Sequence, residues 1–135
     1  MRGFAIEHRA DFDDFTRVTL LRLFGFRVVL HIFKKSDHLP FHDHPYNILS
    51  ILLWGKYTEL TPVKDDALSR MRARDRRAPS IWWIPATRAH KILLFPGQRT
   101  ITLCVLGRKF REWGFLVGGQ WVHNKTHLLK KGLLR

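Results

Sequence analysis

Two histidines stand one residue apart in the stretch PFHDHPYN, residues 40–47. If residues 42–44 are extended, alternate side chains share a face, so His42 and His44 project together with their Cα atoms about 7 Å apart, while Asp43 faces the other way. Two imidazoles placed in this way can converge on one metal ion. A pair of solvated loop histidines is the alternative interpretation.

A third imidazole is available in IPATRAHKILLF, residues 84–95. Pro85 and the turn after it lead into His90 at the start of an expected strand, and a neighbouring strand can bring this side chain to the same point. A stable metal site needs a ligand beyond the two that the His-x-His pair supplies. We therefore predict that His42, His44 and His90 bind one divalent metal ion.

The rest of the chain consists mainly of short β-branched and aromatic runs separated by Gly and Pro, a pattern typical of an all-β domain. Strands are expected at 18–23, 26–33, 48–54, 56–61, 80–84, 90–95, 100–106 and 111–117, with turns at Gly25 and Gly55. Their spacing suits a small sandwich or barrel. Residues 65–75 have helix-forming composition instead, and the basic tail is either a short helix or a loose end.

Length and composition favour one domain. The 135 residues are 45% hydrophobic and 13% aromatic, which is enough for one buried core. We expect a single domain over residues 1–135, with the barrel core at about 18–122, an N-terminal arm at 1–17 and a basic tail at 123–135. Cys104 is the only cysteine, so no internal disulfide can form and a reducing compartment is expected.

Neither a signal peptide nor a membrane span is expected. The first residues lack an uninterrupted apolar core. The most apolar early stretch, residues 17–33, carries Arg17, Arg22 and Arg27, and charges inside a span are costly in lipid. We therefore expect a cytoplasmic location and no membrane partner.

The formal net charge of +13 keeps anionic partners in view. Five arginines fall within residues 70–77, but no recognised nucleic-acid motif accompanies them. A solvated basic segment is the simpler interpretation. We expect any nucleic-acid binding to be weak, independent of sequence and strongly reduced by salt.

HDHPYNILSILLWGKY resembles the first cupin motif, in which a hairpin glycine, here Gly55, follows the histidine pair. PATRAH resembles the second cupin motif, with a proline five residues before the third histidine. The resemblance implies a double-stranded β-helix, or jelly-roll barrel, with a metal bound inside by His42, His44 and His90.

A closer resemblance covers roughly residues 26–122. It is to a family of small single-domain cupin-like proteins of phages and bacteria, whose pattern is HDHPW, GGYxE, HRIEL, WGF and GWV and whose function is not established. Here Tyr46 replaces the usual Trp and Lys91 the Arg after the third His. The resemblance implies a protein of a bacterial cell, phage-encoded as an alternative.

Many cupins supply a glutamate four residues after the second histidine, where this chain has Ile48. Three neutral imidazoles with open positions resemble the sites of thiol dioxygenases and some diketone-cleaving dioxygenases. Fe(II) is therefore favoured, with Zn, Ni or Mn as alternatives. The predicted function is an Fe(II)-dependent dioxygenase acting on a small polar molecule. The alternatives are a non-catalytic binding or structural module and a metal-dependent isomerase or hydrolase of a sugar- or nucleotide-like ligand.

Four further residues are candidates for the site. Tyr57 and Glu59 share a face of the strand after Gly55, and Glu59 is expected either to orient an imidazole or to form a surface ion pair. Arg76 and Arg77 are candidates for holding a carboxylate of the substrate, against a solvated loop as the alternative. A homodimer is also expected, since cupins often pair.

Overall fold

The protein is described by a computed structural model over residues 15–36, 40–63 and 70–130. The described elements, apart from one short helix, are strands, as the sequence predicts. In chain order they are β1 (Phe15–Leu23), β2 (Phe26–Phe33), β3 (Phe41–His42), β4 (Ile48–Trp54), β5 (Lys56–Pro62), β6 (Met71–Arg77), β7 (Ser80–Ile84), β8 (Lys91–Leu93), β9 (Thr100–Leu106), β10 (Gly114–Val117), β11 (Gln120–His123) and α1 (Asn124–Lys130).

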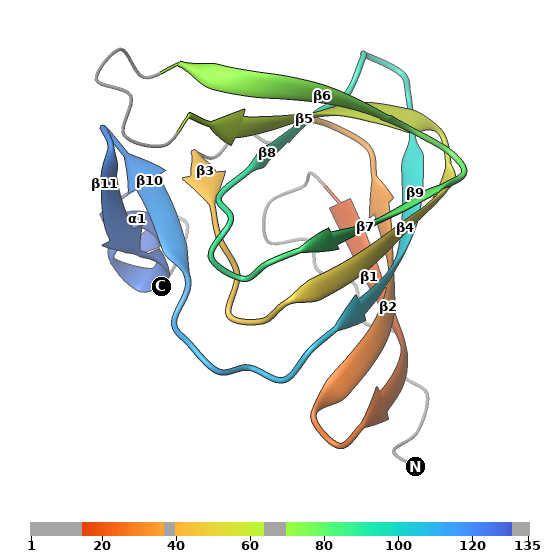
Figure 1. The fold of residues 1–135 in the computed structure, drawn as a ribbon, viewed down its shortest axis with the longest axis horizontal. Coiled ribbons are helices and arrows are strands. Elements are labelled where there is room, and N and C mark those ends of the chain that lie inside the picture. The colour runs from red at the N-terminus through yellow and green to blue at the C-terminus, as the bar shows by residue number, and fades with distance from the viewer. Residues whose placement is uncertain (1–14, 37–39, 64–69, 131–135) are drawn as a thin grey trace.

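The strands form two walls. One is a five-stranded antiparallel sheet in the order β1-β2-β9-β4-β7, and the other combines two three-stranded sheets, β11-β10-β3 and β6-β5-β8. These smaller sheets meet where His42, at the end of β3, forms an antiparallel bridge with His90, the residue before β8. Figure 1 shows the walls rolled around a common interior, with β3 between β10 and β8. The prediction of a single all-β jelly-roll domain is confirmed.

Strand alternation decides which side chains face the interior. In β9, Thr100, Thr102, Cys104 and Leu106 are buried and the residues between them are half-buried. Two clusters of buried side chains form the core, one containing Val29, Tyr46, Ile48, Ile84, Cys104 and Leu106 and the other Phe33, Leu52, Tyr57 and Ile92. The inner faces therefore carry polar as well as apolar groups.

The two turn glycines serve different purposes. Gly25 lies in the predicted hairpin, since β1 and β2 pair up to Leu23 and Phe26 on either side of it. Gly55 was expected in a hairpin as well, but β4 and β5 belong to different sheets, so it turns the chain from one wall to the other. It has φ of +85°, and a Cβ there would lie 2.4 Å from the carbonyl oxygen of Arg99. Only glycine fits this corner without strain.

The prediction of a helix over residues 65–75 is wrong for residues 71–75, which the structure describes as part of a strand. From Met71 the chain forms β6, which pairs with β5 at seven positions from Lys56 to Pro62. This long pairing outweighs the helix propensity of the side chains. Because β6 is an edge strand, its exposed arginines also discourage pairing with other chains. Residues 65–69 lie outside the described part.

The two ends of the described chain pack on the barrel. Strand β1 begins at Phe15, three residues before the expected start of the barrel core. Helix α1 begins the basic tail, and its His127 is buried against Phe115 with ring centroids 4.6 Å apart. In the described residues, no helix has the length and apolar character that crossing a bilayer requires.

Candidate metal centre

His42, His44 and His90 come together inside the barrel. One ring nitrogen from each lies within 4.8 Å of the other two. The ring centroids are 5.4 Å apart for His42 and His44, 5.1 Å for His42 and His90, and 4.9 Å for His44 and His90. His90 is buried and the other two are half-buried. This is the grouping that the spacing of the two motifs predicts.

Backbone hydrogen bonds hold the three histidines in this arrangement. His42 and His90 exchange both backbone N–H···O bonds, at 3.2 and 3.0 Å, so they are direct cross-strand partners with side chains on one face. Beyond the end of β3, the His44 N–H donates to the carbonyl of Ala86 at 3.0 Å. Each motif therefore fixes the backbone of the other. Asn47 adds to this by accepting from the Ala86 N–H at 2.8 Å.

The three side chains fit one metal ion. His44 Nε2 and His90 Nε2 are 3.3 Å apart, and two nitrogens bound at about 2.1 Å to the same ion are separated by about 3.0 to 3.4 Å. Burial, followed by the neighbouring His90 and His42, holds the pKa of His44 well below its usual value, which keeps its imidazole neutral and able to bind a metal. Within the described residues, the buried Nδ1 of His44 has no hydrogen-bond partner.

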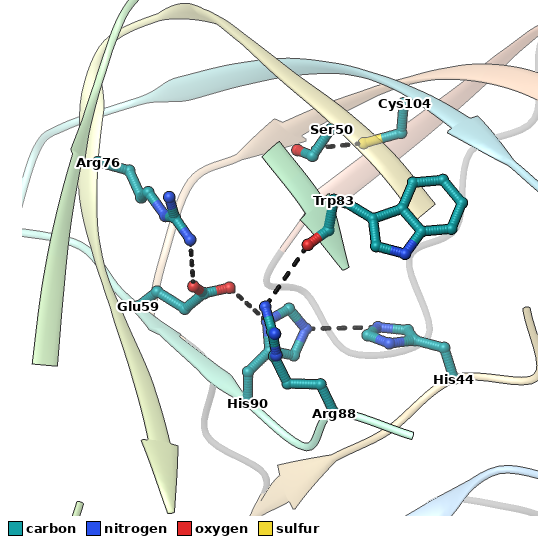
Figure 2. A network of polar contacts seen from close by, with 8 residues as sticks. All are labelled: His44, Ser50, Glu59, Arg76, Trp83, Arg88, His90 and Cys104. Atoms are coloured by element: carbon teal, nitrogen blue, oxygen red, sulfur yellow. Dashed lines mark hydrogen bonds and ion pairs between the residues drawn. The ribbon is translucent and has the colours of Figure 1, made fainter. Parts of the chain in front are cut away.

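Glu59 on β5 fixes the orientation of His90. Its Oε2 lies 2.9 Å from His90 Nδ1, and its Oε1 accepts from Arg76 Nη2 at 3.0 Å, as Figure 2 shows. Burial would raise the pKa of Glu59, but its hydrogen bonds and the charges of His90 and Arg76 lower it to about 2. An ionised carboxylate only accepts, so His90 carries its proton on Nδ1 and directs the Nε2 lone pair toward the other histidines.

Glu59 makes both of the interactions expected as alternatives, one with an imidazole and one with an arginine. It contacts an imidazole and an arginine together, and the ion pair is buried rather than at the surface, with Arg76 and Glu59 side chains 12% and 4% exposed. The guanidinium of Arg76 also lies over the Trp82 ring, 4.2 Å from its centroid. Arg76 is therefore occupied with Glu59 and Trp82.

Arg77 and Tyr57 lie on opposite faces of the sheet that contains β5 and β6, since Tyr57 pairs with Arg76 and Arg77 is the next residue. Arg77, the next residue on β6, is exposed and lines a separate surface hollow beside Gly55 and Pro79. Tyr57 is buried and lines the cavity that contains the three histidines. Of Tyr57, Arg76 and Arg77, only Tyr57 lines this cavity.

Asp43, between the two motif histidines, is buried and directs its carboxylate toward β10 and β11 rather than toward the histidines. Its Oδ1 accepts from the Gly114 N–H at 2.7 Å and its Oδ2 from Trp121 Nε1 at 3.0 Å. Arg111 Nη1 also lies 3.0 Å from Oδ2. Asp43 therefore ties the histidine segment to β10 and β11, a role that the sequence analysis did not assign.

The histidines face a cavity of about 620 Å³. Its walls are largely aromatic and aliphatic, and they include Ile48 at the position where many cupins have a carboxylate ligand. Phe33, Tyr46, Trp113 and Phe115 add rings to the lining. The volume lies within the usual range for sites that bind small molecules.

A second polar group lines the same cavity. Arg17 Nε donates to His31 Nε2 at 2.9 Å, and His31 Nδ1 lies 3.9 Å from Cys104 Sγ. Burial, followed by the charges of Arg17 and Arg27, holds the pKa of His31 well below its usual value, so its ring is neutral. Burial raises the pKa of the Cys104 thiol, which agrees with an inert cysteine.

His123, the other histidine of the basic tail besides His127, does not belong to the three-histidine group. His123 Nε2 is 3.3 Å from Glu112 Oε1, and its Nδ1 accepts from the Lys125 N–H at 3.2 Å. It thus has partners of its own and lies on β11, across β10 from His42, outside the three-histidine group.

Comparisons with known proteins agree on the architecture. No protein-family model matches the chain, and no curated protein matches its sequence. Among solved structures, the polyketide cyclase RemF from Streptomyces resistomycificus is similar over 98% of this chain and 93% of its own, with a TM-score of 0.67 and 15% identity. A cupin superfamily protein from Desulfitobacterium hafniense is similar over 76% of this chain and 84% of its own, with a TM-score of 0.54 and 17% identity.

A third similar structure is hydroxypropylphosphonic acid epoxidase from S. wedmorenis, which matches over 70% of this chain and 51% of its own, with a TM-score of 0.56 and 11% identity. Likeness at these identities shows the fold, and the chain folds as a cupin. The resemblance drawn from the two motifs is confirmed at that level. Membership of the small phage and bacterial family stays a prediction.

Proposed function

We propose that the protein is a metal-dependent enzyme in which His42, His44 and His90 hold one Fe(II) ion and a small molecule enters the adjoining cavity to react with O₂. The observation that carries this proposal is that three imidazoles face a cavity whose lining has the apolar Ile48 at the sequence position where many cupins have a carboxylate ligand. Held by these three histidines, Fe(II) would supply a site for a chelating substrate and the capacity to activate O₂.

The chain's own residues would prepare the centre. Glu59 holds the proton on His90 Nδ1, and Arg76 keeps Glu59 ionised through its contact at 3.0 Å. The rings of Trp113 and Phe115, with centroids 6.5 and 6.3 Å from that of His42, limit access of water to the histidines. Tyr57 presents its side chain to the same cavity and is the candidate for positioning the substrate.

The first test is the metal content of protein purified without a histidine tag. We expect about one first-row ion per chain in the parent and in His123→Ala, which removes a surface histidine paired with Glu112. The variant in which His42, His44 and His90 are all replaced by Ala should retain none. Equal metal content in this triple variant and the parent would refute the centre.

The second test separates an enzyme from a binding module. The Fe(II) form, prepared without O₂, is offered a panel of thiols, diketones and small carboxylates, and O₂ uptake is followed beside the His90→Ala variant. We expect uptake above the variant's level with a ligand that also shifts the iron spectrum. A ligand that shifts the spectrum while uptake stays at the variant's level would favour the non-catalytic module.

A further inference from the structure

The cavity that contains the three histidines has an arginine wall, formed by Arg17, Arg22 and Arg27 of the β1–β2 hairpin. These arginines, which interrupt the most apolar stretch of the sequence, line the interior of the barrel. Asp43 is the one acid among the described residues of the lining, and its carboxylate is already engaged by Gly114, Trp121 and Arg111. Among the described residues of the lining, basic side chains therefore outnumber acidic ones.

A β-bulge is what turns Arg22 toward the cavity. The register passes from Thr19 opposite Val29 to Leu21 opposite Val28, so β1 contains one extra residue. In an unbroken ladder Leu21 would stand opposite Arg27 and face the interior. With the bulge, Arg22 takes that place instead. Bulges are common beside active sites because they redirect a side chain in this manner.

The bulge places two like charges directly opposite each other, since Arg22 pairs with Arg27 in the ladder and both line the cavity. An anionic group of a ligand placed between the two guanidinium groups would offset their mutual repulsion. Arg17 extends the wall further inward, where its Nε contacts His31.

The arginine wall lies within reach of the metal centre. The His44 ring stacks on Tyr46 with centroids 6.3 Å apart, and the Arg27 Cζ lies 5.5 Å from the centroid of the same Tyr46 ring. Tyr46 thus lies beside both a histidine of the centre and a guanidinium of the wall. A small molecule with an anionic group at one end and a metal-binding group at the other can span this distance.

We propose that the arginine wall binds the anionic group of the substrate, with Arg27 as its anchor, and that the substrate is a mainly apolar or aromatic carboxylate-type anion. The aromatic and aliphatic remainder of the lining, Phe33, Tyr57, Ile84 and Ile92 among it, favours an apolar body over a sugar. This inference rests on the proposed function for the identity of the cavity as the substrate site. It replaces Arg76 and Arg77 as carboxylate ligands, because neither lines this cavity.

The test compares two probes of equal shape and different charge, 3-phenylpropionate and 3-phenylpropionamide. Calorimetric titrations use the chain freed of metal by a chelator. We expect the parent to bind the acid at least tenfold more tightly than the amide. Arg27→Met should remove this preference and leave the affinity for the amide within about twofold, while Arg27→Lys should keep part of it.

Arg72→Met is the matched control, because it removes the same charge from an exposed position on β6. It should leave both affinities within about twofold of the parent. Failure of the parent to bind either probe, equal affinity for the two, or an equal loss in Arg72→Met and Arg27→Met would overturn the proposal. If Arg27→Met does not fold, the parent comparison and Arg27→Lys still decide it.

The anion site and the metal centre can be refuted independently of each other. A parent that prefers the acid but holds no metal would refute the metal chemistry and leave the anion site intact. A parent that holds metal through the three histidines but does not distinguish acid from amide would refute the anion site and leave the metal centre intact.

Discussion

Replacing Glu59 by Gln tests how the metal centre is oriented. The substitution keeps the size of the side chain but removes the charge that His90 Nδ1 and Arg76 Nη2 share, at 2.9 and 3.0 Å. Gln can also present its NH₂ group to His90, which would move the ring proton to Nε2 and block the lone pair that faces His44. The variant should therefore bind metal less tightly.

The substitution should lower both the metal affinity and the free energy of unfolding. Loss of a carboxylate that orients a metal-binding histidine typically lowers metal affinity by about 10- to 100-fold, or about 1.4 to 2.7 kcal/mol. The folding free energy should fall as well. The pKa of Glu59 is lowered from 4.5 to about 2 by His90 and Arg76, so the ionised carboxylate stabilises the fold at neutral pH, and breaking a buried pair typically costs about 3 to 5 kcal/mol.

The assay is competition between the protein and a chromophoric chelator for Co(II) or Zn(II) at pH 7.5, with thermal unfolding of the metal-free forms measured in parallel. Thr58→Val is the control, since it removes an exposed hydrogen bond of 2.8 Å to Asp75 between the same two strands. Its metal affinity should match that of the parent.

A Glu59→Gln variant that folds and binds metal within twofold of the parent would show that the carboxylate does not orient His90. A comparable loss of affinity in Thr58→Val would show that pairing of β5 with β6, rather than the carboxylate, supports the centre.

Two further predictions concern stability. Gly55→Ala should lower the free energy of unfolding by about 2 to 5 kcal/mol through a left-handed φ and a clash with the Arg99 carbonyl, whereas Gly97→Ala, with φ of +80° in open space, should cost about 1 to 2 kcal/mol; equal losses in chemical denaturation would contradict the corner argument. The pKa of His31 is held well below 6.5, so the unfolded chain takes up a proton that the folded chain does not, and stability should fall below pH 6.5 by up to about 1.4 kcal/mol per pH unit. His31→Gln should reduce this slope between pH 5 and 7.5, while the part due to His44, whose pKa is also lowered, remains; an unchanged slope would refute the assignment to His31.

The sequence by itself determined the class of fold and the three histidines. Each of the eight strands predicted from the runs between Gly and Pro residues overlaps a strand of the structure. This part of the prediction works because period-two patterns and turn residues act locally. The His-x-His spacing likewise places His42 and His44 on one side whenever the chain is extended. The order of the two motifs was enough to single out His90, which the structure brings to the same place through the bridge with His42.

Only the tertiary structure decided what surrounds the histidines. Strand alternation shows that Arg76 and Arg77 face opposite ways, but not which of them points at Glu59. Pairing with β5 also makes a strand of residues 71–77, where composition favours a helix. Such choices depend on partners distant in the sequence.

The arginine wall is the clearest case. From the sequence, Arg22 and Arg27 are charges that interrupt an apolar stretch, and simple alternation would leave them on opposite faces of the hairpin. The one-residue bulge between Thr19 and Leu21 reverses the faces of β1 beyond it and brings both arginines inside. Local sequence patterns do not predict this bulge, because a bulge is defined by how the residues of two strands pair with each other.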